Sequence, residues 1–202
     1  IDHPVRFLVE NTMISLNVIH EAYQAGVTRL VNIASSCMYP RNISGSLSLP
    51  LLLTAPLEPT NEGYAIAKVA SWKLTEYILR EKPDLLYRTL IPCNLFGPHD
   101  NFHPLYSHML QAAIVKMVSA IERGEDEILV WGNGKARREF MFHPDFADFI
   151  WTFLPRLAEL PPAINVGVGK DKTVTEYYEA VARVVGYKGK FVYDPSKPHG
   201  MD

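Results

Sequence analysis

Tyr64 and Lys68 are the first residues of this sequence whose types and spacing suit acid–base chemistry. They are four residues apart in a stretch without proline, so in a helix their side chains share one face. A phenol has a pKa near ~10 and transfers protons poorly at neutral pH. Because a neighbouring ammonium favours the phenolate, we expect Lys68 to lower the pKa of Tyr64 toward the working range. Such a pair suits proton transfer at a carbonyl or alcohol oxygen.

The same spacing occurs at Tyr193 and Lys197, but Pro195 lies between these two residues. A proline inside a helix removes a hydrogen bond and breaks the helix, so nothing aligns these side chains. Only the pair at 64 and 68 is therefore a candidate site.

Hydroxyl and thiol side chains follow the first predicted strand. The short, β-branched segment 29–35 is typical of a buried parallel strand, and Ser35, Ser36 and Cys37 stand at its end. In an open parallel sheet, ligands bind beyond the carboxyl ends of the strands, which is where these side chains would point. A serine there can hydrogen-bond the same substrate oxygen that a tyrosine protonates.

The elements that must position these residues alternate along the chain. Apolar spacing predicts helices over 7–25, 65–82, 107–122, 144–158 and 174–185, and strands over 29–35, 87–93, 127–132, 138–143, 164–167 and 190–193. Residues 40–60 lack a period and are predicted to form a long loop. This alternation predicts an α/β fold, a doubly wound parallel sheet covered by helices.

Composition excludes several classes of protein. Twenty Lys and Arg against 22 Asp and Glu leave no basic excess for a general nucleic-acid or membrane surface. The longest apolar stretches reach about eight residues, far short of the roughly 20 that span a bilayer. The two cysteines, 37 and 93, form no Cys-x-x-Cys pair, so no disulfide framework or zinc ribbon is indicated. We therefore expect a cytoplasmic protein that binds neither nucleic acid nor membrane.

A metal site is a further possibility that the spacing does not favour. His99, His103 and His108 lie near Asp100, which together could suggest metal ligands. The loop contains Pro98 and Pro104, so no helix brings the first two histidines onto one face. No metal is expected.

Four linked motifs carry a resemblance to a known family. They are Ser-Ser-Cys-x-Tyr-Pro (35–40), Tyr-Ala-x-Ala-Lys (64–68), Pro-x-Asn-Leu-x-Gly-Pro-His-Asp-Asn-Phe-His-Pro (92–104) and Val-Trp-Gly-x-Gly (130–134). In this order they resemble the extended short-chain dehydrogenase/reductases. Within that superfamily, Cys37 and the run 97–104 resemble the GDP-L-fucose synthase family. The resemblance implies a homodimeric, NADPH-dependent enzyme that converts GDP-4-keto-6-deoxy-D-mannose to GDP-L-fucose by 3,5-epimerisation and 4-reduction.

The resemblance also implies that 1–202 is a middle-to-late piece of a longer enzyme, inactive alone. The family opens with strands and a Gly-x-x-Gly-x-x-Gly phosphate loop that these residues lack, and it continues past the Lys-Pro-x-Gly segment. We expect 1–100 to be the C-terminal portion of a Rossmann-like NAD(P)-binding domain. Residues 101–202 would be mostly a smaller, nucleotide-sugar-binding α/β part, with 138–167 returning to the main domain. His199 stands where the family has an Asp that contacts substrate.

By resemblance, site roles carry over residue by residue. Tyr64 would donate the proton in the reduction, while Cys37 and His108 would be the base and acid that invert C3 and C5. The implied catalytic residues are Ser35, Cys37, Tyr64, Lys68 and His108. The implied cofactor-binding residues are Ser36, Tyr64, Lys68, Pro92, Cys93, Asn94, Leu95 and His108. The implied substrate-binding residues are Lys116, Trp131 and Arg138, and Arg137 could exchange roles with Arg138.

Two alternative functions stay open. The chain could come from another nucleotide-sugar epimerase, dehydratase or reductase of the superfamily, or be a non-catalytic fragment or binding module. A dehydratase would need an acid pair just after the serines, and Ser36-Cys37-Met38 supplies none. A simple C4-epimerase does not need a carbon acid/base couple, so Cys37 with His108 counts against it. These residues do not decide whether the cofactor is NADP or NAD, or whether the nucleotide of the substrate is GDP or another.

Overall fold

The computed structural model describes residues 3–43, 45–103 and 107–196. The chain forms two compact units, the first made of Ile1–Cys93 and Pro144–Gly167, the second of Asn94–His143 and Val168–Asp202. The chain thus leaves the first unit, returns to it once and leaves it again. The assignment of one part to the cofactor and the other to the substrate stays a prediction.

A three-stranded parallel sheet forms the centre of the first unit, in the order β1-β2-β7 (Arg29–Ile33, Leu86–Pro92 and Ala163–Val166). Ile33 pairs with Leu90, and Pro92 pairs with Val166, so the carboxyl ends of the strands share one edge. The central strand β2 is buried from Tyr87 onward, as expected of a parallel strand covered on both faces. The predicted α/β fold with a parallel sheet is confirmed.

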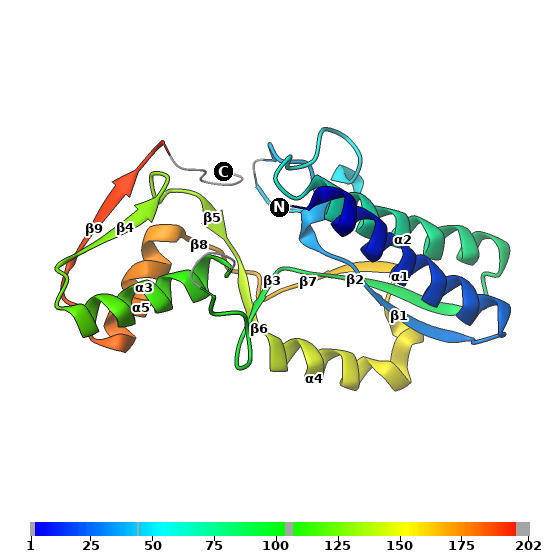
Figure 1. Ribbon diagram of the computed structural model, residues 1–202. Helices are drawn as coiled ribbons and strands as arrows, with labels where there is room; N and C mark the ends of the chain where they lie inside the picture. Colours follow the sequence, from blue (N-terminus) through cyan, green and yellow to red (C-terminus); the bar gives the residue numbers. More distant parts are fainter. Residues whose placement is uncertain (1–2, 44, 104–106, 197–202) are drawn as a thin grey trace. The chain divides into compact units, whose positions relative to one another are not determined.

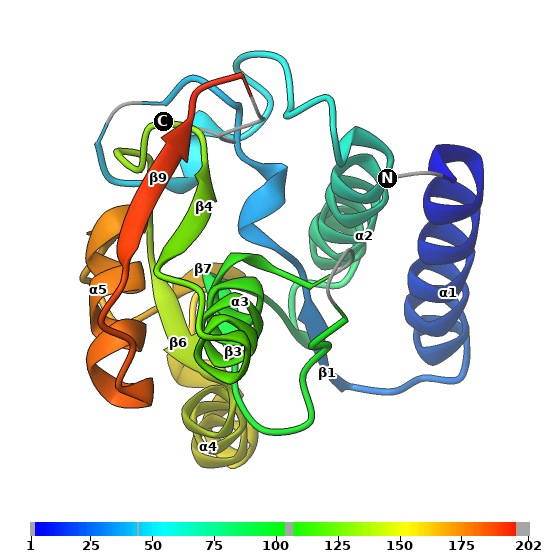
Figure 2. The ribbon, with the colours of Figure 1, turned by 60° about the vertical axis from the view of Figure 1, so that its left-hand side comes forward.

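Helices α1 (Pro4–Gln24) and α2 (Glu62–Glu81) run side by side in both ribbon views (Figures 1 and 2). Gly63 permits their close approach, because a Cβ there would lie 3.2 Å from the carbonyl oxygen of Pro4. At the other end, buried Ile19 and Ile78 pack with Tyr87 of β2. The other side chains of α1 are half-buried or exposed, since Ile19 is the one buried residue of this helix.

The second unit packs α3 (Met109–Arg123) and α5 (Val174–Val185) against the parallel pair β4 (Glu127–Trp131) and β9 (Lys190–Asp194). Fully buried Met117 and Val130 lie in this core. Thr173 starts α5 with a capping box, in which its hydroxyl and the Glu176 carboxylate each bond the other residue's backbone N–H. Two further pairs complete the unit: parallel β3 (Asn94–Phe96) with β6 (Phe140–Phe142), and antiparallel β5 (Arg137–Arg138) with β8 (Lys172–Thr173).

Several predicted boundaries were wrong. The helix predicted over 144–158 ends as α4 (His143–Phe153), and Leu154–Glu159 is a 3₁₀ turn, because Pro155 cannot continue an α-helix. The helix predicted from residue 7 begins at Pro4, where proline at the first position suits a helix start. Strands β3 and β8 were not predicted, since two or three residues are too few to show alternation. The strand predicted over 138–143 is two short strands, β5 and β6, which pair with different partners. The remaining helices and strands lie close to their predicted ranges.

In the part of the chain that the structure describes, no helix combines the length and apolar character that a membrane span requires.

Candidate active site

A tight turn at the end of β1 presents the serines and Cys37. Ala34 follows the strand and is buried, and the 3₁₀ turn Ser36–Met38 begins directly after Ser35. The Ser35 hydroxyl oxygen accepts a hydrogen bond of 3.2 Å from the backbone N–H of Cys37. This bond fixes the turn, and all three of Ser35, Ser36 and Cys37 stay half-buried rather than enclosed.

Lys68 connects helix α2 to the same strand end. Its ammonium Nζ donates a hydrogen bond of 2.9 Å to the backbone carbonyl of Ile33, the last residue of β1. The same Nζ lies 5.6 Å from the centroid of the Tyr64 ring, so the two side chains share a helix face as predicted. Burial lowers the pKa of Lys68 below its usual value.

The pKa of Tyr64 differs from the sequence-based expectation. Burial raises the pKa of this phenol above its usual value, the negative charge of a Cys37 thiolate would raise it further, and a hydrogen bond with Ser35 lowers it in part. The prediction that Lys68 lowers the pKa was wrong in direction for this state, because Lys68 faces the ring and bonds Ile33 instead of the hydroxyl. A raised pKa keeps Tyr64 protonated at neutral pH, as a proton donor must be.

Asn61 also belongs to this cluster, and the motifs did not point to it. Its amide Nδ2 donates a hydrogen bond of 3.2 Å to the Cys37 sulfur. Asn61 is the residue that precedes the first residue of α2, three positions before Tyr64. The available signal was an Asn at a helix start, which by itself predicts only a cap.

The structure therefore brings four predicted catalytic residues together in the first unit: Ser35, Cys37, Tyr64 and Lys68. They come from the end of β1 and the first two turns of α2, which are rigid elements. This arrangement offers a phenol, a hydroxyl, a thiol and an ammonium around one position. Such a set can transfer protons to an oxygen and at a neighbouring carbon.

The predicted cofactor residues 92–95 lie where the chain crosses from the first unit to the second. Pro92 is buried at the end of β2, and the backbone N–H of Cys93 donates a hydrogen bond of 3.0 Å to the Val166 carbonyl. The side-chain amide of Asn94 donates a hydrogen bond of 3.0 Å to the carbonyl of Glu139, and Leu95 pairs with Met141 in the β3–β6 pair. These bonds give the segment a structural role, and its contact with a nicotinamide stays a prediction.

His108 belongs to the second unit and immediately precedes α3. Its side chain is exposed, and its backbone carbonyl accepts the first helical hydrogen bond, 2.8 Å from the N–H of Ala112. Its predicted pairing with Cys37 as an acid stays a prediction. Among the described residues, no three His, Cys, Asp or Glu side chains are grouped as a metal site would require.

Lys116 and Trp131 are brought together by α3 and β4. The Lys116 ammonium donates a hydrogen bond of 2.9 Å to the carbonyl of Leu129 and lies 5.6 Å from the centroid of the Trp131 ring. Burial lowers the pKa of Lys116. Trp131 is 54% exposed, so a flat apolar surface with a cation beside it is open to solvent. The pair suits a ligand with a ring and a negative charge.

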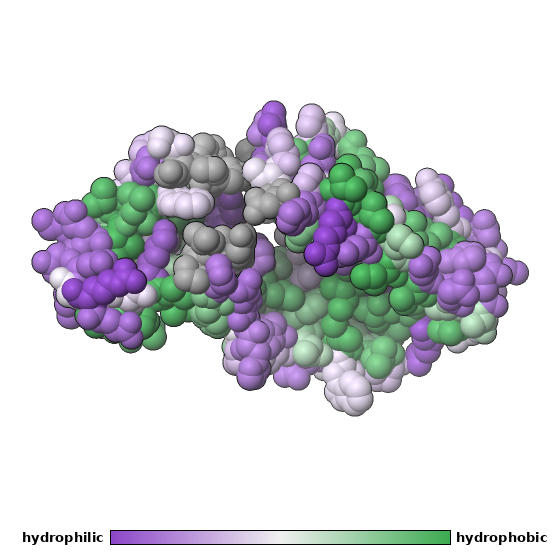
Figure 3. Space-filling model, viewed as in Figure 1, coloured by the Kyte–Doolittle hydropathy of each residue, from purple (hydrophilic) through white to green (hydrophobic). Residues whose placement is uncertain are grey.

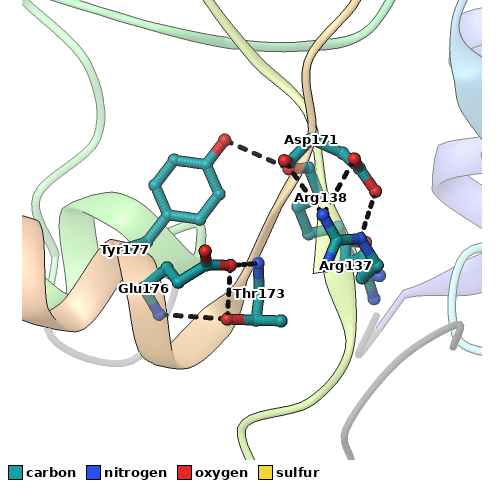
Figure 4. Close-up of polar contacts among 6 residues, drawn as sticks. All are labelled: Arg137, Arg138, Asp171, Thr173, Glu176 and Tyr177. Carbon is teal, nitrogen blue, oxygen red and sulfur yellow. Dashed lines mark hydrogen bonds and ion pairs between the residues drawn. The ribbon is translucent and has the colours of Figure 1, made fainter.

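The structure separates the roles of the two adjacent arginines (Figure 4). Arg137 grips the Asp171 carboxylate with two hydrogen bonds, from Nε at 2.5 Å and from Nη2 at 3.0 Å. Arg138 has other partners. Its Nη1 donates a hydrogen bond of 2.6 Å to the backbone carbonyl of Arg137, and its own backbone carbonyl accepts a hydrogen bond from the Tyr177 hydroxyl. The guanidinium of Arg137 is therefore held by Asp171, and the role of Arg138 in substrate binding stays a prediction.

Some predicted features lie outside the described residues. Pro104, the last residue of the motif 92–104, is among them. Lys197 and His199 of the Lys-Pro-x-Gly segment are as well.

Comparison with known proteins assigns this chain to a family. A profile for the NAD dependent epimerase/dehydratase family matches residues 1–167. The chain is 50% identical to a GDP-L-colitose synthase of Yersinia pseudotuberculosis, over 100% of this chain and 65% of that protein. It is 48% identical to a GDP-L-fucose synthase of Azorhizobium caulinodans, over 98% of this chain and 63% of that protein. The chain therefore belongs to the NAD dependent epimerase/dehydratase family.

A solved structure agrees with this placement. A GDP-L-fucose synthetase from Naegleria fowleri bound to NADP matches with a TM-score of 0.83 and 28% identity, over 98% of this chain and 63% of that one. The predicted resemblance to the GDP-L-fucose synthases is confirmed. The chain spans somewhat less than two thirds of the length of these relatives.

The raised pKa of Tyr64 predicts the outcome of a titration. In the protein without cofactor, the absorbance change that Tyr64→Phe removes should appear at higher pH than that of exposed tyrosines, because burial disfavours the phenolate. Cys37→Ser should move that midpoint to lower pH, since the thiolate charge then no longer opposes ionisation. The measurement is a difference ultraviolet titration, and a Tyr64 midpoint below that of exposed tyrosines would contradict the raised pKa.

Proposed function

We propose that the whole protein is an NADPH-dependent nucleotide-sugar epimerase/reductase that converts GDP-4-keto-6-deoxy-D-mannose to GDP-L-fucose in the cytoplasm. The observation that supports this most is the cluster of Ser35, Cys37, Tyr64 and Lys68 at the end of β1. A reductase needs the hydroxyl pair and the ammonium, whereas a 3,5-epimerase also needs a group that removes protons from carbon. Cys37 is that additional group.

The residues present fit the nicotinamide half of NADPH. Tyr64 and Lys68 lie beside the carboxyl end of a parallel strand, which is where such sheets bind nucleotides. Lys68 would hold the nicotinamide ribose, and Ser36 with Pro92–Leu95 would line the ring. When bound, NADPH supplies the hydride for C4. In this proposal the first unit binds the cofactor and the second binds most of the nucleotide sugar.

In the epimerisation, the Cys37 thiolate takes a proton from C3 or C5 of the sugar. The C–H bond breaks, an S–H bond forms, the electron pair becomes a C=C bond to C4, and the pi electrons of the C4 carbonyl move onto its oxygen to give an enolate. His108 then gives a proton to the same carbon from the opposite face, which inverts it. In the reduction, the Tyr64 hydroxyl gives its proton to the C4 oxygen while Ser35 holds that oxygen by a hydrogen bond.

A second candidate product follows from one relative. The sequence identity to the GDP-L-colitose synthase is 50%, and that to the Azorhizobium GDP-L-fucose synthase is 48%. A GDP-L-colitose product would use the same reductase residues on another GDP-linked keto sugar. Assay of both products with NADPH separates the two activities.

The two half-reactions should separate by mutation in the whole protein. Tyr64→Phe removes the proton donor, so it should abolish reduction yet still let solvent deuterium enter the keto sugar at C3 and C5. Cys37→Ser should slow that exchange by about 10²–10⁴, because loss of a general base has this effect and a hydroxyl is a far weaker base than a thiolate. NMR of the sugar in deuterated water measures both, and normal exchange in Cys37→Ser would remove the main support for a 3,5-epimerase.

The two arginines provide a matched pair for the substrate site. Arg138→Ala should raise KM for the GDP-sugar at least about tenfold, since an arginine–phosphate bond is strong and directional. Arg137→Ala should change KM little, because this side chain serves an exposed pair with Asp171, and exposed ion pairs contribute little to stability. Steady-state kinetics compare the variants, and the reverse order would assign the substrate to Arg137.

A homodimer is also part of the proposal, with α1 as a contact surface. Met13, Ile14 and Val18 are each more than half exposed, at 57%, 65% and 61%. Figure 3 shows hydrophobic surface beside hydrophilic surface over the first unit, which includes α1. Since the opposite side of α1 already packs on α2, a second copy of the chain is the occupant we infer for this face.

Charged substitutions test that surface. Ile14→Glu with Val18→Glu should convert the whole protein from dimer to monomer, because two carboxylates would have to be buried in the interface. Val184→Glu on α5 is the matched control, since Val184 is 87% exposed in the second unit and should leave the dimer intact. Light scattering at micromolar concentration gives the mass, and a monomeric unmodified protein would refute the dimer.

A further inference from the structure

Asn61 adopts a side-chain orientation that its position does not explain. It precedes the first residue of α2, where Asn normally accepts a hydrogen bond from a backbone N–H of the first turn. Here its side chain makes no such cap. Its amide group donates to the Cys37 sulfur at 3.2 Å, and its Oδ1 is buried with no hydrogen-bond partner among the described residues.

The orientation is unfavourable for α2 considered alone. The helix start loses a cap, and a buried carbonyl oxygen is left unsatisfied, both of which destabilise a folded protein. The contact that replaces them is to one sulfur atom. An amide N–H aimed at sulfur interacts more strongly with a thiolate than with a thiol, since hydrogen bonds to a charged acceptor are stronger.

Cys37 is consequently held at two points. The Ser35 hydroxyl oxygen accepts from its backbone N–H at 3.2 Å, and Asn61 donates to its sulfur. Asn61 immediately precedes α2 and Tyr64 lies in its first turn, so the start of this helix carries both the partner of the sulfur and the phenol. The position of the thiol relative to Tyr64 is thus set by one rigid element.

We propose that Asn61 is a positioning residue for Cys37, whose sulfur its amide holds in place for attack on the sugar. The inference rests on the proposed function of Cys37 as the base for C3 and C5. Asn61 itself exchanges no proton. Once the thiolate has taken a proton from carbon, the amide faces a neutral thiol, and the interaction strengthens again when the sulfur loses that proton.

Two substitutions distinguish this role from that of a helix cap. Asn61→Asp keeps the shape and caps a helix as well as Asn does, but a carboxylate presents only acceptors to the sulfur. Asn61→Ser also caps well and removes the amide without adding charge. Both variants should fold, and a purely structural role for Asn61 predicts that both behave like the unmodified protein.

The first measurement is the rate at which iodoacetamide alkylates Cys37 in the whole protein at pH 7, with Cys93 of the same molecule as the internal control. Asn61→Asp should slow alkylation of Cys37 by about tenfold or more, the effect expected for a lost hydrogen bond to a charged group. Asn61→Ser should slow it less, and Cys93 should change by less than about twofold in both. An unchanged rate at Cys37, or equal changes at both cysteines, would overturn the inference.

The second measurement is deuterium exchange into the keto sugar at C3 and C5. Exchange should fall by the same factor as alkylation while KM and the capacity for C4 reduction are retained. If alkylation of Cys37 slows but exchange does not, Asn61 still acts on the sulfur and the assignment of Cys37 as the base is refuted. The two measurements therefore test the inference and the proposed function separately.

Discussion

The hydrogen bond from the Lys68 ammonium to the Ile33 carbonyl joins α2 to the last residue of β1. Its position depends on the parallel pairing that holds β1 against β2, with Ile33 beside Leu90. Because the amine is anchored there, Tyr64 one helical turn earlier is brought to the turn that carries Ser35. The site therefore depends on one strand, one helix and the contact between them, and such elements hold side chains more accurately than a loop does.

Charge within this cluster is arranged so that each acid or base keeps a useful form. Burial lowers the pKa of Lys68 and raises that of Tyr64, which in both cases favours the neutral form. A thiolate at Cys37 further favours the protonated phenol, because two negative charges would repel each other. Tyr64 therefore keeps the proton that an acid for oxygen must give, next to the thiol that we propose as the base for carbon.

The second unit holds positively charged side chains at its surface. The Lys116 ammonium donates a hydrogen bond to the Leu129 carbonyl of β4 and lies beside the Trp131 ring. The Arg137–Asp171 pair fastens β5 to the segment before β8, and Arg138 follows in the same short strand. Two hydrogen bonds between oppositely charged groups give this connection a defined geometry even though it is exposed.

The sequence alone determined the alternation of helices and strands, the parallel sheet and the family resemblance, because apolar periodicity and the spacing of motifs are local properties. It also indicated Ser35, Cys37, Tyr64 and Lys68, which the structure brings together. The tertiary structure decided the direction of the Tyr64 pKa, which depends on burial, and the commitment of Arg137 to Asp171, 34 residues away. It also decided the contact of Asn61 with Cys37, since a hydrogen bond across 24 residues leaves no periodic trace in the sequence.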